Sequence, residues 1–240
     1  MSDSGAFGPA RLCARIVGNV DLMLGAKARG LLERHMVASG GRFAGVRHST
    51  AWHADIHKVA PVPGMLAHPS FRAGFAALGD LGLVFDAWVY HTQLAEVAEL
   101  ADAFPRTAIV LNHCGSPILG GPYAAKRDQA FAEWRAGMAE LARRPNVTVK
   151  VGALPIRLPG DGAPRDVPPS SEEIAAAWGP WMRACIDLFG ADRCMFESNF
   201  PVQKRWSGYG ATWNGFKRIA QGASADEKAA LFAGTASRVY

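Results

Sequence analysis

The stretch LGLVFDAWVYHTQLAEVAELADAFPRTAIVLNH, residues 81–113, decides the fold class of this chain. Its first ten residues are rich in aliphatic and aromatic side chains, which predicts a buried strand. Residues 93–104 carry apolar side chains at helical spacing and stop before Pro105. Residues 108–113 are again apolar and predict a second strand. A strand, a helix and another apolar strand in this order indicate a parallel β–α–β unit.

The same alternation extends from this unit in both directions along the chain. It predicts six strands, at residues 12–20, 43–48, 81–90, 108–113, 146–151 and 193–198. It predicts helices at residues 25–37, 69–78, 93–104, 123–144, 171–189, 213–221 and 224–237. Repeated strand–helix units of this kind form an α/β fold with a parallel sheet. No linker or break in composition divides the interior, so we expect one domain over residues 1–240.

Two α/β architectures fit this pattern, an open doubly wound sheet and a (β/α)8 TIM barrel. The first usually has a glycine-rich turn after its first strand, and GNVD at residues 18–21 does not match that turn. Polar residues instead follow nearly every strand, at Asn19, Arg47–His48, Tyr90–His91, Asn112–His113, Lys150 and Glu197–Asn199. This distribution favours a TIM barrel, whose active site is built from the loops after the strands.

The barrel that the sequence predicts is incomplete. A TIM barrel has eight strands, and only six are visible in these 240 residues. The first two strands of the fold are the ones that we expect to be missing. The strands at 12–20 and 193–198 would then be the edges of the sheet. We expect an apolar gap between these edges, which a second copy of the chain could cover in a homo-oligomer.

Composition excludes several classes of function. The 26 basic residues exceed the 21 acidic ones, for a net charge of +5, but they are scattered and do not form a nucleic-acid-binding patch. No apolar run reaches the roughly 18 residues of a membrane span, and residues 1–10 do not resemble a signal peptide. The four cysteines lie far apart, which is typical of reduced thiols. We expect a cytoplasmic protein whose partner is a small-molecule substrate.

Three residues are candidates for catalysis. His113 ends a predicted strand directly before a turn, and a histidine at such a position can transfer protons near neutral pH. Strand alternation puts Glu197 and Asn199 on the same face, which is the inner one if Phe196 packs outward against the helices. The alternatives are structural: His113 as a hydrogen-bonded core residue, and Glu197 as a buried carboxylate paired with a basic side chain.

Four further strand-end residues are candidates for substrate binding, namely Arg47, His48, His91 and Lys150. Arg47 could hold an anion through its guanidinium fork, and Lys150 could bind substrate or move a proton. The competing interpretation for Arg47 is a structural salt bridge. For His91, which follows an aromatic stretch, a packing role is the competing interpretation.

The segments GRFAGVRHS, LVFDAWVYH, FPRTAIVLNHCGSP, PNVTVKVG, DRCMFESNFPV and LFAGTASRVY together resemble the amidohydrolase-2 family, and the similarity runs over residues 11–240. These proteins are TIM-barrel hydrolases that include lactonases and a decarboxylase branch. The resemblance implies a hydrolase acting on a lactone, ester or amide bond of a small, carboxylated molecule. It also implies attack by water on a carbonyl group, polarised either by a divalent metal such as zinc or manganese or by histidine and arginine side chains.

Two departures from the family pattern concern the metal. His113 matches a strand-end histidine of the family and is the candidate metal ligand, whereas Asn199 stands where many members carry an aspartate. The His-x-His pair that begins the family's barrel is absent from these residues, which agrees with the two missing strands and suggests an N-terminally truncated barrel. We therefore expect no tightly bound metal in this chain. The alternative function is a catalytically impaired barrel that serves as a ligand-binding or scaffold protein.

Overall fold

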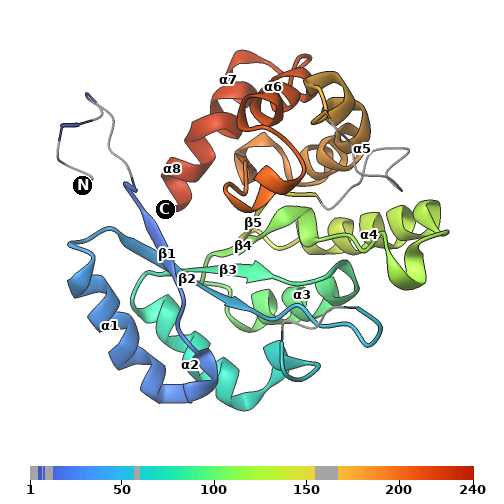
Figure 1. Cartoon of the computed structure of the whole chain (residues 1–240). Coiled ribbons are helices and arrows are strands. Elements are labelled where there is room, and N and C mark those ends of the chain that lie inside the picture. Colours follow the sequence, from blue (N-terminus) through green and yellow to red (C-terminus); the bar gives the residue numbers. More distant parts are fainter. Residues whose placement is uncertain (1–4, 7, 9–12, 57–59, 155–166) are drawn as a thin grey trace.

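A computed structural model describes residues 5–6, 8, 13–56, 60–154 and 167–240. Six parallel strands follow one another across a single sheet in the order of the sequence. They are β1 (Ile16–Gly18), β2 (Phe43–Ser49), β3 (Val84–Trp88), β4 (Ile109–Leu111), β5 (Val147–Gly152) and β6 (Cys194–Glu197). The sheet curls into half a barrel with most of the helices around its outside (Figure 1). This confirms the predicted incomplete TIM-barrel type, with β1 and β6 as its edges.

One α-helix lies between each pair of successive strands, and three more follow the last strand among the described residues. They are α1 (Ala28–Ala38), α2 (Pro69–Asp80), α3 (Leu94–Ala103), α4 (Arg127–Ala142), α5 (Ser171–Phe189), α6 (Tyr209–Ile219), α7 (Ala225–Ala229) and α8 (Thr235–Val239). α5 begins at a capping box in which the side chains of Ser170 and Glu173 accept each other's backbone N–H groups. The helix predicted at 224–237 is divided by a π-helical turn, Ala230–Gly234, between α7 and α8. None of the described helices is both long and apolar enough to cross a membrane.

The main core lies between the outer face of the sheet and the helices. Phe85 of β3 points outward and packs with Phe71 and Phe75 of α2, at ring-centroid distances of 5.8 and 5.2 Å. Trp134 of α4 and Trp181 of α5 are also fully buried and lie 4.7 Å apart. Because alternate residues of a strand face opposite sides, the same strands direct their other side chains to the inner face. The outer face is therefore the hydrophobic one, and the inner face is free to carry polar groups.

The apolar part of the inner face is covered by the last helix. Val84, Val110 and Met195 form a small separate cluster, against which Ala236, Val239 and Tyr240 pack. The backbone oxygen of Tyr240 accepts a hydrogen bond from Arg15, just before β1, at 2.5 Å. Figure 1 shows the end of α8 beside the start of β1. α8 thus covers the apolar residues of the inner face. The expected apolar gap between the edge strands β1 and β6 stays a prediction.

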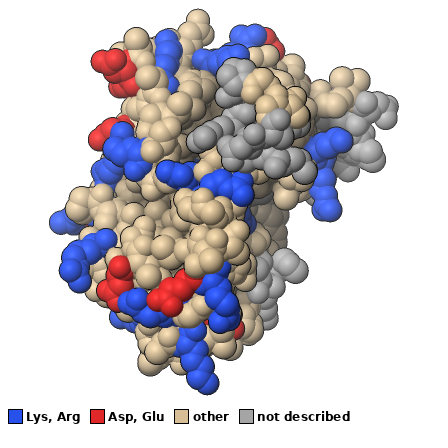
Figure 2. All heavy atoms as spheres, turned by 90° about the vertical axis from the view of Figure 1, so that its left-hand side faces the viewer, with Lys and Arg blue, Asp and Glu red and all other residues tan. Residues whose placement is uncertain are grey.

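Charged side chains of both signs are spread over the surface. On the face drawn in Figure 2, basic and acidic side chains are interspersed, most closely at its lower end. Several of them form exposed pairs, such as Arg29 with Asp80 at 2.7 Å. Exposed pairs of this kind contribute little to stability because water and salt screen them.

A pair of glycine substitutions tests the packing of β2 on β3. A Cβ at Gly45 would lie 2.4 Å from the backbone oxygen of Val84, whereas a Cβ at Gly30 in α1 would meet no heavy atom within 4 Å. We expect Gly45→Ala to lower the free energy of unfolding by about 2 kcal/mol through overpacking. Gly30→Ala should raise it by up to about 1 kcal/mol, since alanine favours a helix. Urea unfolding of both variants measures this, and equal stabilities would contradict the described strand pairing.

Candidate functional site

The candidate site lies at the edge of the sheet where the parallel strands end. Three neighbouring strands, β4, β5 and β6, are each followed within two residues by a non-glycine residue in the left-handed region of backbone space. These residues are His113, Ala153 and Asn199, with φ angles of 58°, 53° and 51°. Such conformations cost on the order of 1 kcal/mol or more and concentrate at functional sites. They turn the chain sharply at the strand ends and so present His113 and Asn199 at this edge.

His113 and Glu197 form the closest pair of this edge. The Nδ1 atom of His113 lies 2.5 Å from Oε1 of Glu197, and the backbone N–H of His113 donates to the same oxygen at 2.9 Å. Both side chains are largely buried. The carboxylate favours the tautomer in which Nδ1 carries the hydrogen, which leaves Nε2 as the basic nitrogen. In the described part of the chain, Nε2 of His113 has no hydrogen-bond partner.

Glu197 is held as a carboxylate. Burial raises the pKa of Glu197, but its interactions with His113, together with the charge of Lys150, lower this pKa more, and the net result lies below the usual value. The close approach of β6 to β5 depends on Gly152. A Cβ at that position would lie 2.0 Å from the backbone oxygen of Glu197 and 2.9 Å from its Cγ.

A second group of polar residues lies on the inner face of the sheet. Asp86 of β3 is 2% exposed, and its Oδ2 atom lies 2.5 Å from Nζ of Lys150. Oδ1 of Asp86 accepts a hydrogen bond from the hydroxyl of Tyr240 at 2.5 Å. The side-chain amide of Asn112 donates to Oδ2 at 3.2 Å. Asp86 is not among the candidate site residues of the sequence analysis, although an aspartate in the middle of an apolar strand was a visible signal.

Arg47 lies on the same inner face, in register with Asp86 on the neighbouring strand. Its guanidinium carbon is 4.8 Å from the ring centroid of Trp88, and that ring meets the ring of His113 edge-on at 6.1 Å. Within the described ranges, Arg47 has no carboxylate partner. A cation that is stacked on an aromatic ring and lacks a counter-charge can bind a ligand anion.

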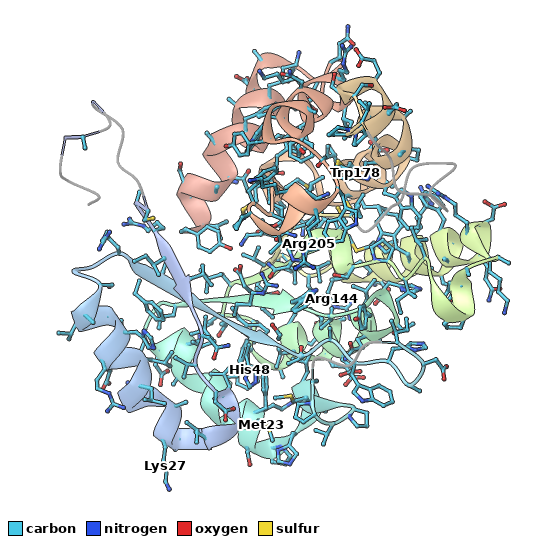
Figure 3. The ribbon with its side chains drawn as sticks, in the orientation of Figure 1. Met23, Lys27, His48, Arg144, Trp178 and Arg205 are labelled. Atoms are coloured by element: carbon cyan, nitrogen blue, oxygen red, sulfur yellow. The ribbon has the colours of Figure 1, made fainter. Side chains whose placement is uncertain are left out.

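Two of the predicted substrate-binding histidines stand apart from this group. The Nδ1 atom of His48 accepts a hydrogen bond from the backbone of Leu22 at 3.2 Å, and its ring lies 5.7 Å from that of Phe71. These contacts, and the view in Figure 3, place His48 between β2 and α2, on the outer side of the sheet. Burial lowers the pKa of His48, with Asp21 opposing the shift. The role of His48 in substrate binding stays a prediction, and so does the role of Asn199 in catalysis. The backbone carbonyl of Asn199 accepts a hydrogen bond from the backbone N–H of Gln203 at 2.9 Å.

His91 follows β3 and is buried. Its Nδ1 atom accepts a hydrogen bond from the backbone of Ile118 at 3.2 Å, while its Nε2 atom is buried and has no hydrogen-bond partner among the described residues. Burial lowers the pKa of His91 to about 4, against a smaller opposing effect of Glu133. The ring is therefore neutral at pH 7, with its hydrogen on Nε2. It can donate a hydrogen bond there, and it carries no charge to offer an anion.

The described residues do not fit a metal ion of the usual kind. A zinc site in a protein takes three or four donors, mostly histidine, cysteine and carboxylate side chains. No group of three or more such side chains is gathered in the described ranges. His113 directs Nδ1 at Glu197, and the neighbouring Lys150 is itself a cation paired with Asp86.

Comparison with known proteins finds one matching family and several relatives. A model of the family described as amidohydrolase matches residues 9–240. The chain is 38% identical over 211 residues to the uncharacterized protein y4mH of Sinorhizobium fredii, covering 88% of this chain and 64% of that protein, so it spans less than two thirds of that relative. It is 31% identical over 244 residues to the L-fucono-1,5-lactonase of Burkholderia multivorans, covering 96% of this chain and 72% of the lactonase.

A solved structure has the same fold. It is a crystal structure of an amidohydrolase from Burkholderia multivorans with bound HEPES, with 30% identity and a TM-score of 0.76. The match covers 97% of this chain and 75% of the other. A second crystal form of an amidohydrolase from that organism holds zinc, with 30% identity and a TM-score of 0.72, over 95% of this chain and 73% of that one.

The buried neutral state of His91 predicts a loss of stability in acid. Its pKa is about 4 when folded and about 6.5 when unfolded. The unfolded chain therefore takes up the proton first, and the contribution of His91 is complete above pH 6.5 and lost as the pH falls toward 4. Between pH 7 and pH 4.5 we expect the stability difference between wild type and His91→Gln to shift by about 2 kcal/mol against the wild type.

Guanidinium unfolding at several pH values measures this difference. His35→Gln is the control, because His35 is exposed on α1 and its replacement should leave the pH dependence of the wild type intact. A His91→Gln variant whose stability follows the wild-type pH dependence would show that folding does not lower the pKa of His91.

Proposed function

We propose that this chain, which belongs to the amidohydrolase family, hydrolyses the lactone of a small sugar acid. The likeness to an L-fucono-1,5-lactonase over nearly the whole chain supports a lactone as substrate. The observation that carries the proposal is the His113–Glu197 pair, which lies beside Lys150 and Arg47 at the carboxyl edge of the sheet. These residues are the groups that ester-type hydrolysis needs: a base, an orienting carboxylate and fixed cations.

The chemistry begins at Nε2 of His113. Glu197 orients the imidazole through Nδ1, so Nε2 can take a proton from a water molecule as the water oxygen attacks the lactone carbonyl carbon. The carbonyl oxygen becomes negatively charged in the tetrahedral intermediate. When that intermediate collapses, the bond between the carbonyl carbon and the ring oxygen breaks, and the ring oxygen takes the proton from His113. The products are a free hydroxyl group and a carboxylic acid, which ionises at neutral pH.

Two cations of the inner face have distinct roles in this scheme. Lys150, held by Asp86, offers a fixed positive charge to the oxyanion that develops on the carbonyl oxygen. Arg47, stacked on Trp88 and without a carboxylate partner among the described residues, binds a carboxylate of the substrate or the one that the reaction creates. Asn199 adds hydrogen bonds to substrate hydroxyl groups, of which sugar lactones have several.

These steps use only side chains that the chain itself supplies. The described residues do not offer the donor set of a zinc site, and no step is assigned to a metal ion. We also propose that the protein acts in the cytoplasm, in line with its free cysteines: Cys114, Cys185 and Cys194 are buried thiols.

Lactone hydrolysis by point variants tests the proposal. We expect the wild-type protein to open L-fucono-1,5-lactone faster than the spontaneous reaction, measured by acid release with a pH indicator. Glu197→Gln and His113→Asn should each lower kcat by about 10² to 10⁴ fold, the usual contribution of general base catalysis. Glu33→Gln on α1 is the control, since this carboxylate is half exposed and pairs only loosely with Arg29 at 3.6 Å.

Two results would contradict the proposal in different ways. Tight binding of the lactone without turnover would favour a ligand-binding protein instead of an enzyme. Turnover that Glu197→Gln leaves unchanged would remove the His113–Glu197 pair from the mechanism.

Elemental analysis gives a separate test of the donor set. We expect the purified protein to hold far less than one zinc or manganese ion per chain and to keep its lactone turnover after dialysis against a chelator. One tightly bound ion per chain, lost on His113→Asn, would show that residues beyond the described ones complete a metal site around His113.

A further inference from the structure

Among the described side chains of the inner face, Asp86 has the most hydrogen-bond and ion-pair partners. Its two carboxylate oxygens meet three partners from different parts of the fold: the ammonium of Lys150 on β5, the hydroxyl of Tyr240 after α8, and the amide of Asn112 after β4. Oδ2 contacts Lys150 and Asn112, while Oδ1 contacts Tyr240. Partners on both oxygens fix the rotation of the carboxylate, so its position is determined by the fold.

Lys150 is the partner that gains most from this arrangement. Lysine has a flexible four-carbon stem and a compact charge, so a free lysine at this edge would take many positions. Here Nζ lies 2.5 Å from Oδ2 of Asp86 and 5.1 Å from the centre of the Tyr240 ring. The Lys150 side chain is 18% exposed, against 3% for Asp86, so part of the lysine side chain reaches solvent while its counter-ion is covered.

We propose that Asp86 is a positioning residue, which holds the ammonium of Lys150 at a fixed place on the inner face beside the His113–Glu197 pair. Tyr240 and Asn112 in turn hold the carboxylate of Asp86. The proposal deepens the proposed function and rests on it for the catalytic consequence, but the positioning itself can be measured without any substrate.

The position of Lys150 matters because its charge acts on the nearby carboxylate of Glu197. Lys150 contributes to the lowered pKa of Glu197. Without Asp86, the ammonium could move to Glu197 and compete with His113 for the carboxylate. Asp86 therefore keeps the two carboxylates of the inner face assigned to different partners: Asp86 to the lysine and Glu197 to the histidine.

A labelling experiment measures the positioning directly. The folded protein is treated briefly with an acetylating reagent, and mass spectrometry gives the acetylation of Lys150 relative to exposed Lys217. An amine that is held against a carboxylate and covered by a ring reacts slowly. We expect Asp86→Asn to raise the relative acetylation of Lys150 by about threefold or more, because the amide no longer holds the ammonium. Tyr240→Phe, which keeps the ring and removes one hydrogen bond to Asp86, should raise it less.

The controls separate positioning from unfolding. Asp80→Asn makes the same chemical change at an exposed aspartate of α2 and should leave the acetylation of Lys150 unchanged. Each variant is checked by circular dichroism and thermal unfolding. If Asp86→Asn does not fold, Tyr240→Phe carries the test. Unchanged acetylation of Lys150 in every folded variant of the Asp86 group would overturn the proposal.

Kinetics then link the positioning to the proposed reaction. We expect Asp86→Asn to lower kcat for the lactone with a KM within about threefold of the wild type, because a fixed charge acts on the transition state more than on substrate binding. A wild-type protein that opens no lactone, combined with the expected acetylation result, would contradict the proposed function and leave the positioning role standing. Lactone turnover by the wild type, combined with unchanged acetylation of Lys150 and unchanged kcat in Asp86→Asn, would support the proposed function and overturn the positioning role of Asp86.

Discussion

The ion pair of Asp86 with Lys150 is the interaction on which the inner face depends. A carboxylate that is 2% exposed is stable only if charged and polar groups replace the water that it has lost. That requirement brings β5, the segment after β4 and the end of α8 to one point in the curled sheet. Removing one partner would leave a buried charge uncompensated, which costs several kcal/mol. The sheet can keep this polar centre because its other face already buries the large aromatic side chains.

At the strand ends, the functional side chains are positioned in a different way from the Asp86–Lys150 pair. There the backbone does the positioning: left-handed residues turn the chain at His113 and Asn199, and Gly152 lets the last two strands come close enough for Glu197 to reach His113. The Asp86 group holds a cation in place, and the strand ends hold a base, His113, and its orienting carboxylate, Glu197. The division explains why two carboxylates can lie near one lysine and one histidine without exchanging partners.

The sequence was sufficient for the order of strands and helices, for the six-stranded incomplete barrel and for the likeness to the amidohydrolase family, all of which the structure and comparisons confirm. The pairing of His113 with Glu197 was not predicted, although both residues were expected at the strand ends. Strand alternation could have separated Arg47 from His48, since neighbours on a strand face opposite sides. The contact of Tyr240 with Asp86 joins residues 154 positions apart, and nothing local in either segment indicates it.

The left-handed residues that follow the strands set thermal stability against the precise orientation of the site. Glycine adopts these backbone angles without strain, so replacing Ala153 or Asn199 by glycine relieves a conformational cost of order 1 kcal/mol per position. Glycine also widens the set of accessible angles, and the turn that presents the site would become less rigid. Variants chosen for a higher melting temperature would therefore collect at the positions where precise orientation is needed for turnover.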